Sequence, residues 1–263
     1  MKFSTQNHVL YEEMCPLEFS SRLKECPVAY LPMGTIEWHG PHLPLGADGI
    51  QSQAFFQRVA SAFGGIVLPK LFLGPDRYYH DPEKDFYGMD ICTGDALTSY
   101  PMQRLPGSVY WLPDALFDAM LLQTAKNLKR AGFKILAAHG HGPSNNRFFA
   151  LREEIQETIG LRCISPFDVI SEERLRFQND HAAANETSIT MAVRPDLVHM
   201  EYLKEENDQL AMAGRSPMRY ASVSYGEELL DVNIRAMGEA IRSLLSGDTH
   251  AAETAETKRS TGS

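Results

Sequence analysis

The chain has 263 residues and is 43% hydrophobic, enough to build one large α/β domain or two small ones. Its formal net charge of −9 argues against nucleic acid or an anionic membrane surface as a partner, because both attract clustered lysine and arginine. No apolar run approaches the roughly 20 residues of a membrane span, and the N-terminal segment lacks the apolar core of a signal peptide, so we expect a cytoplasmic protein.

Short apolar runs alternate with amphipathic stretches along the chain, a pattern typical of strands alternating with helices. The sequence predicts strands over residues 28–33, 66–68, 71–73, 133–138 and 161–165. It predicts helices over residues 49–63, 114–130, 144–159 and 227–245. Crossover connections of this length join parallel strands, so we expect a three-layer α/β/α fold with a mostly parallel sheet.

Two parts of the chain do not follow this alternation. Residues 76–106 mix aromatic residues, charges and turn formers; such a long excursion is either functional, as a lid or an oligomer contact, or a decorated surface loop. Residues 247–263 contain no large apolar residue, which predicts a disordered tail. No linker divides the remainder, so we expect a single domain over residues 1–246.

A first candidate site follows the strand predicted at 28–33. If a strand carries Glu37 and His39 at positions i and i+2, both side chains point to the same face, and a loop that turns back can bring Asp48 to meet them. Two carboxylates and an imidazole are ligands of the kind found in hydrolytic metal centres. Asp48 could alternatively cap the following helix, with Gln51 as its capping-box partner.

Two histidines, His139 and His141, come directly after the strand predicted at 133–138. Open parallel sheets bind ligands at the carboxyl ends of their strands, so chemistry is expected at this place. The i, i+2 spacing puts both imidazoles on one face only if the extended geometry persists. The alternative is a strand-to-helix turn in which the two histidines are merely polar turn residues.

A third cluster combines His181 with Glu186, separated by small residues that leave room for a ligand or a water molecule. A helix beginning near Ala184 would place Glu186 in its first turn, where the helix dipole favours a carboxylate. The residues alone equally allow Glu186 to be only a helix-start charge and His181 a surface residue.

Together, the three clusters resemble the signature of the creatininase (creatinine amidohydrolase) family. Glu37-x-His39-Gly40-x-His42-Leu43-Pro44, followed by Asp48, is similar to one of its motifs. Residues 139–142 stand in the place of its Asn-Gly-His-Gly-Gly-Asn segment, and residues 105–108 resemble its Pro-Gly-Thr turn. Residues 180–188 and 194–198 look like its His-Ala-Gly, Glu-Thr-Ser and Pro-x-Leu-Val block. The resemblance runs from about Tyr30 to Val198.

The resemblance implies a creatininase-like fold and a metal-dependent hydrolase that acts on carbon–nitrogen bonds other than peptide bonds. Such an amidohydrolase would cleave a small cyclic or formylated amide with a metal-activated water, using one or two divalent ions of zinc, manganese or iron. The family also implies a homo-oligomer, a hexamer or another assembly. By motif, its metal ligands fall on Glu37, His39, Asp48 and His141, with Asp48 bridging, and its catalytic histidine falls on His181.

Departures from the family pattern indicate a member other than creatininase itself. Gly142 and Pro143 stand where creatininases carry an aromatic residue and a metal-binding glutamate. Glu186 is then the candidate for the missing carboxylate, as a metal ligand and as a participant in catalysis. Phe177 and Gln178 stand where creatininases grip creatinine with a tryptophan and an acid, so creatinine is not the expected substrate.

Two further histidines have open roles. His139 replaces the usual asparagine and would be either a ligand or a donor that supports one, whereas His42 would support the ligands or fix the loop. Two alternative functions are also open: a peptide-processing or deformylating hydrolase of the same family, and a catalytically silent subunit that binds a metabolite or serves in assembly.

Overall fold

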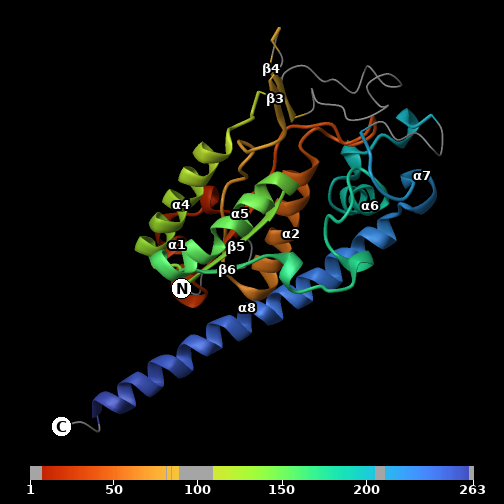
Figure 1. Cartoon of the computed structure of the whole chain (residues 1–263). Helices are drawn as coiled ribbons and strands as arrows, with labels where there is room; N and C mark the ends of the chain where they lie inside the picture. The colour runs from red at the N-terminus through yellow and green to blue at the C-terminus, as the bar shows by residue number, and fades with distance from the viewer. Residues whose placement is uncertain (1–7, 81, 84, 89–108, 205–210, 261–263) are drawn as a thin grey trace.

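A four-stranded parallel sheet forms the centre of the molecule (Figure 1). The computed structural model describes residues 8–80, 82–83, 85–88, 109–204 and 211–260, the last part from residue 248 as backbone only. The strands lie in the order β2-β1-β5-β6 and are β1 (Val28–Met33), β2 (Ile66–Val67), β5 (Ile135–Gly140) and β6 (Arg162–Ile164). Each matches a predicted strand within two residues at either end; residues 71–73 form no strand and join the sheet by a single bridge from Leu71 to Met33.

Alternate residues of β1 pack against different helices, which produces the three layers. Val28 and Tyr30 are buried against one group of helices, α2 (Ala47–Phe63), α6 (Ala184–Val193) and α8 (Val223–Ser260). Leu31 and Met33 are buried on the opposite face, in a core built mainly from α4 (Asp114–Ala131) and α5 (Gly142–Glu154). Because successive side chains of a strand point to opposite faces, one apolar strand supplies both cores. The predicted α/β/α fold is confirmed.

Helix α1 (Pro16–Glu25) was not predicted from the sequence. Proline at its first position suits a helix start, and the Glu18 carboxylate accepts a hydrogen bond from the Cys15 N–H at 2.9 Å. Its buried Arg22 donates to the carbonyl oxygens of Ala60 and Gly65, which ties α1 to the end of α2. A buried arginine obscures the apolar periodicity by which a helix is recognised in a sequence.

The other helices differ from prediction mainly at their ends. The helix predicted at 144–159 is α5 followed by a wider helical turn over Ile155–Ile159, and α7 (Pro217–Tyr220) is a short addition. α8 was expected to end at residue 245, but its backbone stays helical to Ser260 and extends away from the sheet (Figure 1). Alanine and glutamate have high intrinsic helix propensity, which accounts for a helical backbone over this segment. The single domain over 1–246 and the disordered tail over 247–263 both stay predictions.

The excursion that starts at Asp76 begins with an antiparallel hairpin of β3 (Tyr78–His80) and β4 (Asp85–Tyr87). The rings of Tyr78 and Tyr87 pack on Trp111, with centroids 5.6 and 4.6 Å from the indole. Residues 89–108, including the turn at 105–108, lie outside the described residues. The role of the excursion as a whole therefore stays a prediction.

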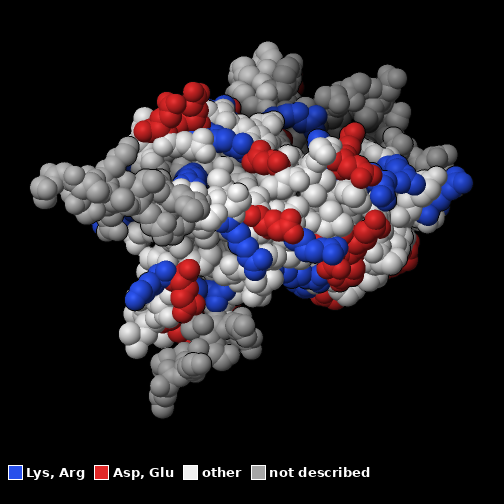
Figure 2. All heavy atoms as spheres, turned by 90° about the horizontal axis from the view of Figure 1, so that it is seen from below, with Lys and Arg blue, Asp and Glu red and all other residues white. Residues whose placement is uncertain are grey.

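No helix in the described ranges is both long and apolar enough to cross a membrane. Basic and acidic side chains are interspersed over the described part of the face shown in Figure 2.

Candidate metal centre

Five side chains with carboxylate or imidazole groups meet at the carboxyl ends of β1 and β5. Met33 and Gly140, the last residues of these neighbouring strands, are paired in the sheet, so the loops that follow start side by side. α2 and α6 each contribute one residue from their first turns. The five buried residues are Glu37, His39, Asp48, His141 and Glu186.

The Nε2 atom of His39 faces three carboxylates at once. It lies 3.4 Å from Asp48 Oδ2, 3.7 Å from Glu186 Oε2 and 3.8 Å from Glu37 Oε1. None of these is a well-formed hydrogen bond, and Nε2 has no hydrogen-bond partner among the described residues. The three carboxylates and Nε2 therefore surround a position that is suited to a cation.

Asp48 lies between the two histidines. Its Oδ2 atom is 3.4 Å from His39 Nε2 and 3.3 Å from His141 Nδ1, and it accepts no hydrogen bond from the described residues. His141 Nδ1 also lies 2.8 Å from Glu37 Oε1. A buried carboxylate oxygen without a donor, shared by two imidazoles, fits a metal ligand better than a structural ion pair.

Three groups of side chains have ligand atoms within 4.8 Å of one another. These groups are His39 with Asp48 and Glu186, Glu37 with Asp76 and His141, and Glu37 with His39 and His181. The structure thus brings together all of the predicted ligand residues and adds Asp76. No motif of the sequence indicated Asp76, which opens the polar excursion; only its place just before the aromatic hairpin could have drawn attention to it.

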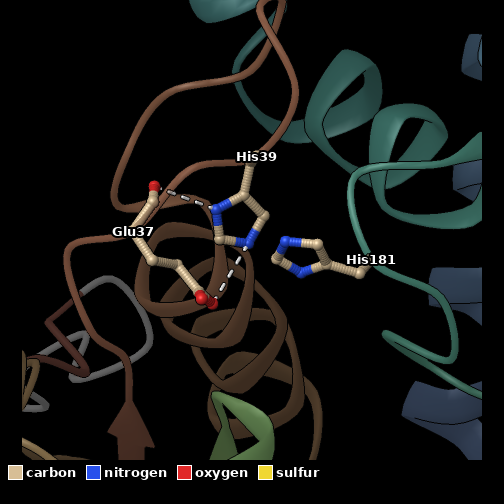
Figure 3. Close-up of side chains that lie close together, drawn as sticks. All are labelled: Glu37, His39 and His181. Atoms are coloured by element: carbon tan, nitrogen blue, oxygen red, sulfur yellow. Dashed lines mark hydrogen bonds and ion pairs between the residues drawn. The ribbon is translucent and has the colours of Figure 1, made fainter. Parts of the chain in front are cut away.

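Glu37 and His39 converge by a different route from the expected one. β1 ends at Met33, and the chain from Gly34 to His39 is a loop rather than a strand. The loop is held by the Glu37 N–H, which donates to Leu45 O at 2.9 Å, and His39 Nδ1 lies 3.4 Å from the Glu37 carbonyl oxygen (Figure 3). Loop hydrogen bonds, and not the pleat of a strand, point both side chains the same way.

Asp48 does not cap α2, so the alternative reading of this residue is wrong. The N-cap position is Gly46, and no side chain caps the helix there. Gln51, the expected capping partner, instead donates from its amide to Thr190 Oγ1 at 2.9 Å and to Glu186 O at 3.3 Å. These bonds join α2 to α6, the two helices that bear Asp48 and Glu186.

The first turn of α6 is fixed by Asp180, whose carboxylate accepts from the N–H groups of Asn185 at 2.7 Å and Glu186 at 3.1 Å. The helix begins at Ala184, as predicted. Glu186 Oε2 accepts a further hydrogen bond from the Ala182 N–H at 2.7 Å. Glu186 is therefore buried and held toward His39, and it is more than a charge at the start of a helix.

Gly140 separates the two histidines that follow β5. Its φ is +153°, and a Cβ at this position would overlap the carbonyl oxygen of Met33, so only glycine fits. After this turn, His141 faces Glu37 and Asp48. Extended geometry through His141 was the condition for the i, i+2 spacing to place both imidazoles on one face, but the strand ends at Gly140 and the condition is not met.

His139 and His42 lie outside the three ligand groups. His139 is buried against Phe167 at a centroid distance of 4.6 Å, and its Nδ1 lies 3.4 Å from Ser165 Oγ; burial lowers its pKa to about 3. His42 Nε2 lies 2.8 Å from Thr187 Oγ1, a contact that ties the loop bearing Glu37 and His39 to α6. His42 thus fixes the loop, and His139 packs behind the site.

His181 points toward the His39 ring, with ring centroids 4.7 Å apart (Figure 3). Its backbone forms two hydrogen bonds with Ala213, at 2.9 and 2.8 Å, which fix its position ahead of α6. Burial, with the neighbouring His39, lowers the pKa of His181. A lowered pKa favours the neutral form of this imidazole near neutral pH.

Burial and the charges of the site act in opposite directions on its pKa values. Burial lowers the pKa of His39, but the carboxylates, led by Asp48, outweigh this effect and raise it to about 10. Glu37 and Asp48 likewise raise the pKa of His141, against burial. The two histidines hold the pKa of Asp48 well below its ordinary value despite its burial, whereas burial raises that of Glu186. Protons on the histidines thus balance the carboxylates, and a metal ion would displace them.

The cluster opens into a cavity of about 330 Å³. Besides the cluster, its walls come from the excursion, the β5–α5 turn with the start of α5, the turn after β6 and the segment before α6: Asp76, Arg77, Gly140, Gly142, Pro143, Asn145, Phe167, Gln178, Asp180 and His181. His181, Asp76 and Arg77 lie on this wall beside the ligands, where a small polar molecule would meet them.

Layered α/β architecture and a buried cluster of carboxylates and imidazoles at the carboxyl edge of the sheet define a protein with a candidate binuclear metal centre. A family model described as creatininase, creatinine amidohydrolase, matches residues 12–256. The chain therefore belongs to the creatininase family.

Three curated relatives are about equally similar. The mycofactocin precursor peptide peptidase of Mycolicibacterium smegmatis is 26% identical over 174 residues, covering 65% of this chain and 59% of the relative. The 3-dehydro-scyllo-inosose hydrolase of Thermotoga maritima is 25% identical over 206 residues, covering 74% and 59%. The creatinine amidohydrolase of Pseudomonas putida is 24% identical, covering 89% and 96%. The match spans about three fifths of the first two relatives, and the three have different activities.

Among solved structures, one described as creatininase Mn superposes with a TM-score of 0.67 at 21% identity, covering 89% of this chain and 98% of that chain. A putative creatinine amidohydrolase from Bacteroides fragilis gives 0.63 at 18% identity, covering 89% and 95%. These likenesses establish the fold.

Proposed function

We propose that the protein is a metal-dependent amidohydrolase that cleaves a carbon–nitrogen bond of a small cyclic or formylated amide. One observation carries the proposal: the buried Asp48 Oδ2 lies within 3.4 Å of both His39 Nε2 and His141 Nδ1 without accepting a hydrogen bond. A buried acceptor without a donor destabilises the protein, whereas an Asp48 that bridged two metal ions would use this oxygen as a ligand.

The donor set fits two divalent ions. His39, Asp48 and Glu186 would hold one, and Glu37, Asp48 and His141 the other, with Asp48 shared. Mixed imidazole and carboxylate ligands suit zinc, manganese or iron. When bound, such ions lower the pKa of a water molecule and polarise a substrate carbonyl group.

His181 is the proposed proton carrier. It lines the cavity next to His39, and its lowered pKa keeps the imidazole neutral near pH 7. A neutral imidazole can accept a proton from the attacking water and pass it to the departing nitrogen. This transfer is needed because an unprotonated nitrogen anion is a poor leaving group. Glu186, with its pKa raised by burial, is the second candidate for proton transfer, at its Oε atoms.

Creatinine is not the proposed substrate. Phe177, which stands in the place of the creatininase tryptophan, is fully buried and stacks on Phe55 at 4.6 Å. Gln178 accepts from Ser52 Oγ at 3.0 Å and donates to Asp48 O at 3.1 Å, so its amide is occupied by the protein. Pro143 lines the cavity without a ligand atom. These three positions support a family member with a different amide substrate.

A substrate panel with controlled metal content tests the proposal. Metal-depleted protein should be inactive toward cyclic amides, such as hydantoins and lactams, and toward formamides, and addition of zinc, manganese or iron(II) should restore turnover. Glu37→Gln and Asp48→Asn should bind less metal and lose activity. Full activity of either variant in a metal-replete preparation would refute the metal-centred mechanism.

A peptide-processing or deformylating hydrolase is the second candidate, favoured by the relative described as a peptidase, which matches 65% of the chain. With peptides added to the substrate panel, cleavage of peptides but not of cyclic amides would select this candidate. Elemental analysis tests the remaining candidate, a silent metabolite-binding or assembly subunit, which predicts no bound metal where an enzyme predicts one or two ions. A homo-oligomer and a cytoplasmic location also stay predictions, to be checked by light scattering and by fractionation.

A further inference from the structure

His141 presents its two ring nitrogens to different neighbours. Nδ1 faces Glu37 Oε1 at 2.8 Å and Asp48 Oδ2 at 3.3 Å, which makes it the nitrogen on the side of the metal centre. Nε2 is buried and has no hydrogen-bond partner among the described residues. The carboxylate oxygen Oδ2 of Asp76 lies 3.9 Å from it.

A histidine that binds a metal through Nδ1 must carry its proton on Nε2. The ligand nitrogen has to be unprotonated, and a neutral imidazole has only one N–H. That N–H lies inside the protein, where a donor without an acceptor is unfavourable. Histidine ligands commonly donate this second proton to a carboxylate, which fixes the tautomer and the ring orientation.

The position and contacts of Asp76 suit it to be that acceptor. Its side chain is only 9% exposed, and its Oδ1 accepts from the Arg77 N–H at 2.6 Å. Its carbonyl oxygen accepts from Trp111 Nε1 at 3.1 Å, so the aromatic hairpin region anchors the residue. With Oδ1 engaged, Oδ2 is the atom directed at His141.

We propose that Asp76 is a positioning residue of the metal centre: its Oδ2 accepts the Nε2–H of His141 and holds Nδ1 toward Glu37 and Asp48. The proposal rests on the function proposed above. The present separation of 3.9 Å needs an approach of about 1 Å to become a hydrogen bond, within reach of a rotation of either side chain. The excursion at residue 76 thereby acquires a role in metal binding that no motif of the sequence indicates.

Direct ligation by Asp76 is the competing arrangement, because ligand atoms of Glu37, Asp76 and His141 lie within 4.8 Å of one another. The geometry favours the arrangement in which Asp76 orients the His141 ring over the one in which Asp76 binds the metal. Asp76 Oδ2 is paired with Nε2, on the side of the ring away from Asp48, whereas the candidate metal position lies on the Nδ1 side.

Three variants test the proposal: Asp76→Ala, Asp76→Asn and, as a matched control, Asp85→Asn. Asp85 is an exposed carboxylate on β4 of the same excursion and contacts Tyr78, His80 and Tyr87 rather than the centre. Each protein is stripped of metal and titrated with zinc against a chromophoric chelator. Metal stoichiometry at saturation, the visible spectrum of the cobalt-substituted protein and the melting temperature of the metal-free form are also measured.

Asp76→Ala should weaken zinc binding by about 10- to 100-fold, with unchanged stoichiometry and a cobalt spectrum of unchanged coordination number. Asp76→Asn should lie between Asp76→Ala and the unaltered protein, because its amide oxygen still accepts the Nε2–H. Asp85→Asn should bind zinc normally.

Unaltered affinity in Asp76→Ala would overturn the proposal. Loss of one ion at saturation in both Asp76 variants, with a changed cobalt spectrum, would make Asp76 a ligand and likewise overturn it. Failure of the unaltered protein to bind zinc, manganese or iron at all would instead refute the proposed function, which keeps the two failures distinct. If Asp76→Ala does not fold, the near-isosteric Asp76→Asn still decides the question, because unaltered affinity in that variant contradicts the expected partial loss.

Discussion

Replacing Asp48 by asparagine removes one negative charge and leaves the shape of the side chain almost unchanged. In the metal-free protein this charge lies 3.4 Å from His39 Nε2 and 3.3 Å from His141 Nδ1. Both imidazoles are buried and have raised pKa values, so both are protonated at neutral pH. The substitution therefore leaves two buried cations with one compensating carboxylate fewer.

The size of the effect follows from the pKa of His39. A rise from 6.5 to about 10 is a shift of about 3.5 units, or roughly 5 kcal/mol in favour of the imidazolium at about 1.4 kcal/mol per unit. Asp48 is the largest favourable cause of this shift. Removing one partner of a buried ion pair costs about 3–5 kcal/mol. At roughly 2–4 °C per kcal/mol for a chain of this size, metal-free Asp48→Asn should melt roughly 10 °C lower.

The pH dependence gives an independent check. A folded-state pKa raised above the unfolded value stabilises the protein fully below about pH 6.5, and this stability is lost as the pH rises through about 10. Metal-free protein should therefore lose stability between these limits, and Asp48→Asn should show a weaker slope. Zinc affinity should change in the opposite direction, rising with pH as the histidines lose their protons.

Differential scanning calorimetry of metal-free samples from pH 6 to 10 measures both effects. Asp196→Asn, at an exposed carboxylate paired with Arg194, is the control and should melt like the unaltered protein. A metal-free Asp48→Asn protein as stable as the unaltered chain, with the same pH slope, would show that Asp48 does not compensate the two imidazolium groups.

Three further predictions follow from the same geometry. Gly140→Ala places a Cβ against Met33 O between β1 and β5, so urea unfolding should show a loss of several kcal/mol, and a loss below about 1 kcal/mol would contradict the close approach. His181→Asn should keep its metal content and lose about 10²- to 10⁴-fold in turnover on any substrate that the panel identifies; unchanged turnover would remove His181 from the reaction. Stripping the metal with a chelator should lower the melting temperature at pH 8, and zinc should restore it by binding the native state; no change on either step would argue against a metal centre.

The central strands were predictable because each carries its signal locally. β1 and β5 are buried on both faces, so their residues form short continuous apolar runs that can be recognised without knowing their neighbours. α1 was missed because its buried Arg22 pairs with carbonyl groups some forty residues away, a contact that the local pattern does not contain. The helix predicted to end at residue 245 has a helical backbone to Ser260, because the hydrophobic periodicity stops at 245 whereas alanine and glutamate keep a high helix propensity beyond it.

The candidate ligands were likewise predictable where a residue stands beside its own turn signal. His141 is flanked by glycines, and Glu186 lies in the first turn of α6, where its N–H donates to Asp180. Asp76 has no such signal. Its carbonyl oxygen accepts a hydrogen bond from Trp111, which lies beyond a long polar excursion, and this contact holds Asp76 near His141. A single aspartate in the sequence gives no sign of such a tertiary contact. The convergence of Glu37 and His39 was predicted correctly but for the wrong reason, because a loop and not a strand brings them together.

Anomalous diffraction from crystals grown with manganese or zinc tests the metal centre most directly. We predict one peak enclosed by His39, Asp48 and Glu186 and a second enclosed by Glu37, Asp48 and His141, with Asp48 common to both. Metal-replete crystals with no peak at either position, or with peaks bound only by residues outside this cluster, would contradict a hydrolytic centre at the carboxyl ends of β1 and β5.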